Sequence, residues 1–141
     1  MPRADGAAEL RVEGPAEPVW LDQVHGALDR LWTVSAPVPE LDRIRFETAV
    51  IELATNVVRH AVPDGPGPVL ASVLLRCDPP RLEAEISDDG RPAVVDLDPA
   101  PVDDLAESGR GIALVKRAVD SLSLDREDGR NTWRIARAWV R

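Results

Sequence analysis

Residues 43–62, RIRFETAVIELATNVVRHAV, constrain the fold of this chain more than any other stretch. Apolar or small side chains recur here at intervals of three and four residues, which is typical of an amphipathic helix that packs one face on a core. These side chains belong to Val50, Leu53, Ala54, Val57, Val58 and Ala61. The pattern predicts a central helix that ends at Pro63, because proline cannot continue a helix.

A polar stripe lies away from this apolar face, at Glu52, Asn56, Arg59 and His60. Glu52 and Asn56 are four residues apart, which places them about 40° from each other around the helix axis. A carboxylate and an amide oxygen therefore stack on one side, with His60 one turn further on. Such a pair can share a ligand or a metal ion. The alternative is an ordinary solvated face of a helix.

Length and charge limit the class of protein. The 141 residues fit one domain, and the formal net charge of -8 argues against binding a nucleic-acid backbone or an anionic membrane. The single cysteine, Cys77, excludes an intramolecular disulfide and a multi-cysteine metal site, and it suits a reducing compartment. No signal peptide is recognisable and no apolar run approaches the ~20 residues of a membrane span, so we expect a cytoplasmic protein.

The remaining pattern predicts helices and hairpins in alternation. We expect residues 1–8 to be disordered and residues 9–141 to form one domain, with 9–12 as a short edge strand. A first helix from Glu17 buries one face, made by Trp20, Val24, Ala27, Leu28 and Leu31. Further segments follow as strands at 69–77 and 81–88, a helix at 109–122, a strand at 122–128, a turn at Gly129-Arg130 and a strand at 131–140. The predicted fold is α+β, a two-layer sandwich in which helices cover one face of a mainly antiparallel mixed sheet.

The strand predicted at 81–88 ends in Asp88, Asp89 and Gly90. Glycine permits a sharp turn and close approach of a ligand to the backbone. A buried carboxylate at this point can accept a hydrogen bond from an amino group such as the exocyclic amine of adenine, and the alternative is an ordinary Asp-Gly turn. Gly, Pro, Asp and Glu then dominate as far as Ser108, and a loop of that length in a compact domain is usually functional, often a lid.

Two glycines, Gly109 and Gly111, flank Arg110 where the next helix is predicted to begin. Free backbone N–H groups and the positive end of the helix dipole make such a position an anion site, and Arg110 is a charge partner for the anion. The segment is neither a P-loop nor a dinucleotide fingerprint, because the required residues do not follow. An ordinary glycine-rich turn into a helix stays open as the alternative.

In series, the three motifs resemble the N, G1 and G2 boxes of GHKL-type ATPases. They read Glu-x-x-x-Asn-x-x-x-His-Ala at 52–61, Asp-x-Gly-x-Pro at 88–92 and Gly-Arg-Gly-Ile-Ala-Leu-Val at 109–115. The resemblance extends from about residue 9 to residue 140. It implies the histidine-kinase-like ATPase fold, and the short single-domain form resembles bacterial anti-sigma-factor serine/threonine kinases.

The resemblance implies a role for each motif, with ATP and Mg²⁺ as cofactors. Asn56 would coordinate the Mg²⁺ that bridges the ATP phosphates, and Glu52 would be the general base for a serine or threonine hydroxyl. Asp88 would read the adenine amine. The other implied residues are His60 and Gly109, Arg110 and Gly111 at the phosphates, Gly90 beside Asp88, Thr132 in support of Asp88, and 91–108 as the ATP lid.

The implied function is a regulatory switch that sequesters a sigma factor and phosphorylates an anti-anti-sigma antagonist on Ser/Thr. Pro92 stands where many family members carry a second glycine, and the acidic lid has no lysine, so we expect weak catalysis at most. Three alternatives remain: a nucleotide-binding interaction module without kinase activity, the catalytic domain of a histidine kinase, and a domain that binds no nucleotide. A homodimer is compatible with the resemblance and with the apolar first helix.

Overall fold

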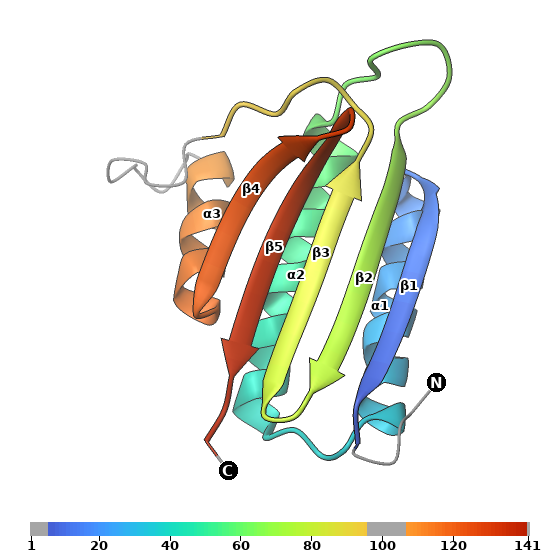
Figure 1. Ribbon diagram of the computed structural model, residues 1–141. Coiled ribbons are helices and arrows are strands. Elements are labelled where there is room, and N and C mark those ends of the chain that lie inside the picture. The colour runs from blue at the N-terminus through green and yellow to red at the C-terminus, as the bar shows by residue number, and fades with distance from the viewer. Residues whose placement is uncertain (1–5, 96–106, 141) are drawn as a thin grey trace.

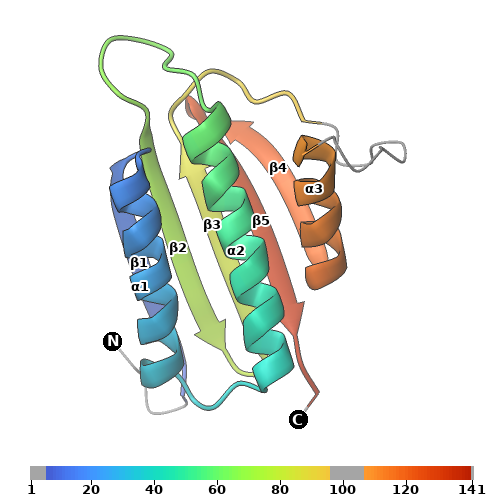
Figure 2. The same ribbon diagram turned by 180° about the vertical axis from the view of Figure 1, so that it is seen from behind.

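The computed structural model describes residues 6–95 and 107–140, which form one sheet with helices on one of its faces (Figure 1). In chain order the elements are β1 (Ala8–Pro15), α1 (Pro18–Val34), α2 (Glu40–His60), β2 (Leu70–Asp78), β3 (Arg81–Asp88), α3 (Glu107–Ala118), β4 (Ser121–Glu127) and β5 (Arg130–Ala138). Figure 2 shows the helical layer from the front, with α2 between α1 and α3.

The strand order is β1-β2-β3-β5-β4, and each neighbouring pair in the described residues is antiparallel. The predicted two-layer α+β sandwich with helices on one face is confirmed, and its sheet is antiparallel throughout rather than mixed. Hairpins join β2 to β3 and β4 to β5. The connection through α3 joins β3 to β4, which run in the same direction with β5 between them, as a helical crossover requires.

The core lies between the three helices and the inner face of the sheet, and α3 contributes Ile112 and Val115. The apolar face predicted for the central helix is confirmed at Val50, Leu53, Ala54 and Val57, whereas Val58 and Ala61 are only partly buried. In the first helix the buried side chains are Trp20, Val24, Leu28 and Leu31, and Ala27 is partly buried. Alternating residues of β2, β3 and β5 complete the core from the sheet, namely Ala71, Val73, Leu75, Cys77, Leu82, Ala84, Ile86, Trp133 and Ile135.

Several boundaries differ from the sequence-based prediction, and the central helix ends at His60, before the predicted Pro63. The helix expected to reach residue 122 ends at Ala118, because the next residues pair with β5: the N–H of Asp120 donates to the carbonyl of Ala136 at 2.8 Å. Arg137 also donates from Nη1 to the carbonyl of Ala118 at 2.9 Å, which satisfies one of the unpaired carbonyls at the helix end.

A further difference concerns the N-terminus. Ala7 and Ala8, expected in a disordered segment, are buried, and β1 begins at Ala8; residues 1–5 of that segment lie outside the described part of the chain. The expected edge strand at 9–12 is present and longer, because the whole of β1 pairs with β2.

The turn between β4 and β5 is formed by Asp128 and Gly129, with φ angles of 51° and 74°. Two consecutive positive φ angles are typical of the primed turns that suit the twist of a hairpin. The turn therefore lies one residue earlier than the predicted Gly129-Arg130. Within the described ranges, no helix has both the length and the apolar character that crossing a membrane requires.

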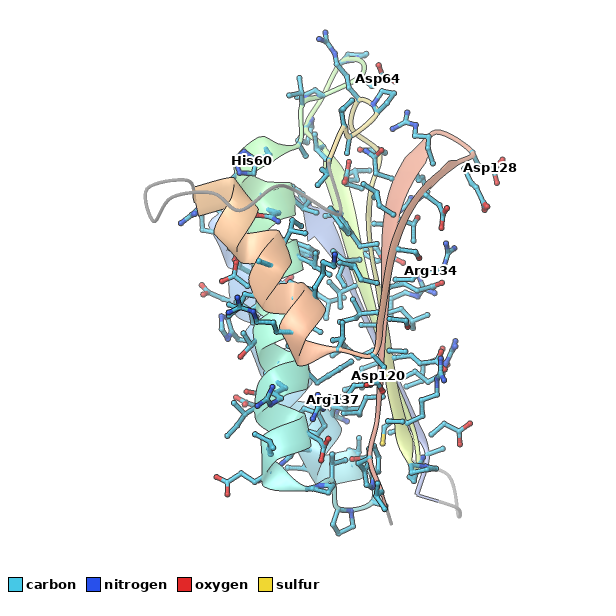
Figure 3. The ribbon with its side chains drawn as sticks, turned by 90° about the vertical axis from the view of Figure 1, so that its left-hand side faces the viewer. His60, Asp64, Asp120, Asp128, Arg134 and Arg137 are labelled. Carbon is cyan, nitrogen blue, oxygen red and sulfur yellow. The ribbon has the colours of Figure 1, made fainter. Side chains whose placement is uncertain are left out.

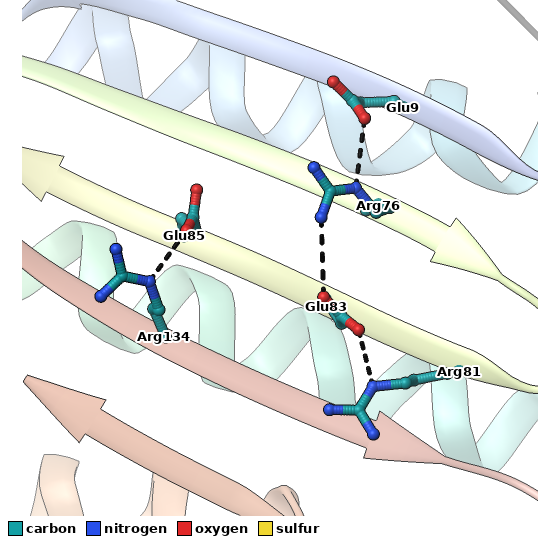
Figure 4. Close-up of polar contacts among 6 residues, drawn as sticks. All are labelled: Glu9, Arg76, Arg81, Glu83, Glu85 and Arg134. Carbon is teal, nitrogen blue, oxygen red and sulfur yellow. Dashed lines mark hydrogen bonds and ion pairs between the residues drawn. The ribbon is translucent and has the colours of Figure 1, made fainter.

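The face of the sheet away from the helices carries paired charges, which Figure 4 shows in detail. Arg76 on β2 bridges Glu9 on β1 at 3.1 Å and Glu83 on β3 at 3.7 Å. Arg134 on β5 pairs with Glu85 on β3 at 2.9 Å. In the side view of Figure 3, Arg134 lies on the opposite side of the sheet from the helices. We call this surface the open face.

Candidate functional site

The three sequence motifs lie toward one end of the sandwich, where α2 and β3 end and α3 begins (Figures 1 and 2). His60 is the last residue of α2 and is exposed at this end of the molecule (Figure 3). Segments that are far apart in the sequence therefore meet here. The contacts fall into two groups, one between α2 and α3 and one around the end of β3.

Gly111 on α3 lies against the polar stripe of α2. A Cβ atom at Gly111 would lie 3.1 Å from Oε2 of Glu52 and 4.0 Å from Oδ1 of Asn56. Glu52 and Asn56 are both half-buried. The lack of a side chain at Gly111 thus lets the carboxylate and the amide oxygen approach the backbone of α3, and the structure brings two of the predicted motifs together.

The helix α3 begins at Glu107, two residues before the predicted start. The first four N–H groups of a helix have no partner within it, and here these belong to residues 107–110. Gly109 and Arg110 therefore supply backbone donors in the first turn, whereas Gly111 supplies the close packing against α2. The anion site that the sequence predicts at this helix end is compatible with the position of α3.

Asp88 is the buried carboxylate that the end of β3 was predicted to hold. It is 4% exposed and lies on the helix-covered face of the sheet, in line with Ile86. Its Oδ1 accepts hydrogen bonds from the backbone N–H of Gly90 at 2.9 Å and from Nδ2 of Asn131 at 3.0 Å. The carboxylate is thus fixed in orientation by two donors to the same oxygen.

Asn131 is a site residue that the sequence analysis missed. Its side chain is 2% exposed, and besides Asp88 it contacts the backbone that follows Gly90. Nδ2 donates to the carbonyl of Arg91 at 2.9 Å, and Oδ1 accepts from the N–H of Ala93 at 2.9 Å. The sequence does carry a signal for Asn131. It is a polar residue at an alternating position of β5, on the same inward-facing side as Trp133 and Ile135.

The support that the resemblance implied from Thr132 comes from its neighbour. Side chains alternate along a strand, so Thr132 lies on the open face, paired in register with Ser87, while Asn131 is the register partner of Asp88. The structure therefore does not bring Thr132 to the Asp88 carboxylate. Asn131 is the residue of β5 that donates a hydrogen bond to this carboxylate.

Gly90 is held in a position that leaves no room for a side chain. A Cβ atom there would lie 2.8 Å from the carbonyl oxygen of Val62 and 3.0 Å from Oδ1 of Asp88. The same Val62 oxygen accepts the N–H of Arg91 at 2.8 Å. Arg126 on β4, also missed from the sequence, donates from Nη1 to the carbonyl of Gly90 at 2.6 Å. The start of the predicted lid is thus attached both to the segment that follows α2 and to the sheet, and residues 96–106 of that lid lie outside the described residues.

These groups fit a nucleotide with a divalent cation. In the described part of the chain, His, Cys, Asp and Glu form no cluster of three that could hold a metal. Mg²⁺ does not require one, because it commonly keeps water and substrate phosphates as ligands beside one or two protein oxygens. Asn56 offers an amide oxygen, the start of α3 offers N–H groups to phosphates, and Asp88 offers an acceptor to an amino group. One end of the site therefore suits phosphates and the other a nucleobase.

The profile of the histidine kinase-like ATPase domain matches residues 15–137. The chain belongs to this family. Family membership implies an ATP-binding domain, in agreement with the donors and acceptors described above.

Solved structures show the same fold. A crystal structure of the RsbU and RsbW domains of Rv1364c from Mycobacterium tuberculosis matches 93% of this chain and 32% of its own length, with 14% identity and a TM-score of 0.68. The histidine kinase domain of the blue-light activated histidine kinase EL346 from Erythrobacter litoralis matches 88% of this chain and 61% of its own, with 19% identity and a TM-score of 0.57. Among curated proteins none matches the sequence. The present chain thus spans less than two thirds of either structure, and the likeness establishes the fold.

Proposed function

We propose that this protein is a cytoplasmic, ATP-dependent anti-sigma regulatory kinase. It sequesters a sigma factor and phosphorylates an anti-anti-sigma antagonist on serine or threonine. The observation that carries the proposal is the meeting of Glu52 and Asn56 with Gly111, together with a buried Asp88 at the end of β3. The likeness to a structure that contains an RsbW domain supports the regulatory part of the proposal.

In this proposal each motif has one task. ATP, when bound, supplies the phosphoryl group. Glu52 accepts the proton of the partner's hydroxyl as its oxygen bonds to the γ-phosphorus and the bond from that phosphorus to the leaving ADP oxygen breaks. Asn56 holds Mg²⁺ through its amide oxygen, and Asp88 accepts a hydrogen bond from the adenine amine.

Calorimetric titration with ATP, with and without Mg²⁺, tests the nucleotide site. We expect Asp88→Asn to raise the Kd by about 10- to 100-fold, because an amino group loses a charged acceptor. Asn56→Ala should remove the dependence on Mg²⁺. Ser87→Ala is the matched control, since Ser87 adjoins Asp88 on β3 but lies on the open face. Folded wild-type protein that binds no ATP at millimolar concentration would contradict the proposal.

Phosphotransfer from γ-labelled ATP tests the activity, with antagonist proteins encoded in the same genome as acceptors. We expect Glu52→Gln to retain ATP binding and to lower the rate of transfer by about 100-fold or more, as for loss of a general base. Transfer that continues undiminished would remove Glu52 from its assigned role.

A histidine kinase ATPase domain is the second candidate, because a histidine kinase shares the fold over 88% of this chain. The stability of the label in acid separates the two. A phosphoserine or phosphothreonine ester survives acid, whereas a phosphohistidine is hydrolysed. Full ATP affinity without transfer to any acceptor would instead favour an interaction module.

A further inference from the structure

Both hydrogen bonds that the Asp88 carboxylate accepts from the described residues go to Oδ1, from Gly90 at 2.9 Å and from Asn131 at 3.0 Å. Within those residues, no group donates a hydrogen bond to Oδ2, and Oδ2 is not among the fully buried atoms that lack a partner. One oxygen is therefore used for orientation and the other is free for a ligand. Because a donor already occupies Oδ1, the free oxygen is presented as an acceptor.

We propose that Asn131 is the positioning residue that sets the nucleobase specificity of this site, and that it does so by orienting Oδ2 of Asp88 as an acceptor for an exocyclic amine. The inference rests on the proposed nucleotide site. Asn131 touches neither phosphates nor reacting atoms, so it acts through Asp88. The ligand class is a purine nucleotide with an amino group at carbon 6, in preference to one with a carbonyl oxygen there.

The side chain of Asn131 has a second task that depends on the same orientation. Its Nδ2 reaches the carbonyl of Arg91 and its Oδ1 accepts from Ala93, each at 2.9 Å. The amide cannot rotate to reverse its oxygen and nitrogen without losing all three contacts, because the donor and the acceptor would be exchanged. The same buried amide thus contributes to the position of residues 91–93 and to the orientation of the Asp88 carboxylate.

The chemistry predicts discrimination between ATP and ITP. ITP carries a carbonyl oxygen in place of the amine, so it would place an acceptor against the Oδ2 acceptor. A hydrogen bond to a charged group increases binding affinity by about 10- to 100-fold. We therefore expect the wild-type protein to bind ATP more tightly than ITP by that factor. Triphosphate and Mg²⁺ contacts are the same in the two ligands and cancel in the ratio.

The experiment measures the Kd of ATP·Mg²⁺ and ITP·Mg²⁺ at pH 8 for the full chain and four variants. Asn131→Asp keeps the shape of the side chain but exchanges the donor for an acceptor, and Asn131→Leu removes its polar atoms. We expect both variants to bind ATP and ITP with affinities that differ by no more than about threefold, since the preference for ATP depends on one oriented hydrogen bond. Thr132→Val, one residue away on the open face, should keep the wild-type ratio.

Asp88→Asn separates a failure of this inference from a failure of the proposed function. If Asp88→Asn leaves the affinity for ATP unchanged, the proposed assignment of Asp88 to the nucleotide site is wrong. If Asp88→Asn weakens ATP binding while folded Asn131→Asp and Asn131→Leu keep the wild-type ratio, Asn131 is only structural and the inference is overturned. Thermal unfolding of each variant establishes that it is folded, and because the ratio compares two ligands on one variant, a smaller folded fraction does not change it.

Discussion

Two faces of the same two strands carry polar groups in different settings. On the helix-covered face, Asp88 and Asn131 are 4% and 2% exposed and hydrogen-bonded at 3.0 Å. On the open face, the side chains of Glu85 and Arg134 are 41% and 43% exposed and pair at 2.9 Å. Although the distances are similar, removing one partner should cost more stability on the helix-covered face. A buried polar group that loses its partner cannot form a hydrogen bond with water instead, whereas an exposed group can.

The difference teaches where to look for function. The open face is a set of exposed charge pairs whose side-chain stems also cover an apolar residue, since Leu74 is only 6% exposed although it lies there beside Glu85 and Arg134. Charged side chains at such positions disfavour pairing of a sheet with another chain. The buried Asp88 and Asn131 bond to each other and to the backbone of residues 90–93, so replacing either one would leave a buried polar group without a partner.

The largest difference between the faces should appear at adjacent residues of β3. Ile86 is fully buried and Glu85 is half-exposed on the other face. We expect Ile86→Ala to lower the free energy of unfolding by about 2–5 kcal/mol through lost burial and a residual cavity. Glu85→Ala should lower it by less than about 1 kcal/mol. Urea denaturation with unchanged m-values measures both, and equal effects would contradict the assigned faces.

The next effect concerns Gly90 at the end of the buried network. Gly90→Ala forces a Cβ against the Val62 carbonyl, 2.8 Å away, so the surrounding backbone must move. We expect a loss of about 1–3 kcal/mol in stability, in the range of overpacked sites, together with weaker ATP binding. Gly65→Ala is the control, since no atom lies within 4 Å of a Cβ atom there. If the two variants are equally stable, the segment is less tightly held than the contacts indicate.

A smaller effect is expected for the charge pair of the open face. A double-mutant cycle with Glu85→Ala and Arg134→Ala should give a coupling free energy of about 0.2–1 kcal/mol. The coupling should fall as salt is raised from 50 mM to about 1 M, because exposed charges are screened. A coupling well above this range, or one that salt does not change, would mean that the open face is covered by something in solution.

The smallest effect is expected at high pH from Cys77, a buried thiol on the inner face of β2. Burial raises its pKa above the ordinary value of 9.0, so the folded state favours the neutral thiol. The stability that this group contributes is present below the unfolded pKa and is lost as the pH rises through the folded pKa. The difference in unfolding free energy between wild type and Cys77→Ala should therefore narrow above pH 9. A difference that stays constant with pH would show that the thiol is not desolvated.

Several features of the fold follow from the sequence alone because their causes are local. The spacing of Val50, Leu53, Ala54 and Val57 determines a helix with one buried face wherever that helix packs, and alternation in Leu82, Ala84 and Ile86 determines which face of β3 is inward. The order of the Glu52–Asn56, Asp88–Gly90 and Gly109–Gly111 motifs was likewise sufficient to indicate the family. The roles of these residues toward ATP and a partner stay predictions.

Tertiary structure alone decided the strand order and the partner of Asp88. Register places Asn131 opposite Asp88 and Thr132 opposite Ser87, and a shift of one residue would exchange the two faces of β5. That register depends on the exact position of the hairpin turn at Asp128–Gly129, one residue earlier than predicted, and on long-range pairing with β3, which no motif encodes. The sequence determined the chemical groups of the site, because periodicity and motif spacing are local properties. Which polar side chain meets the carboxylate depends on how two distant strands align, and only the folded sheet determines that.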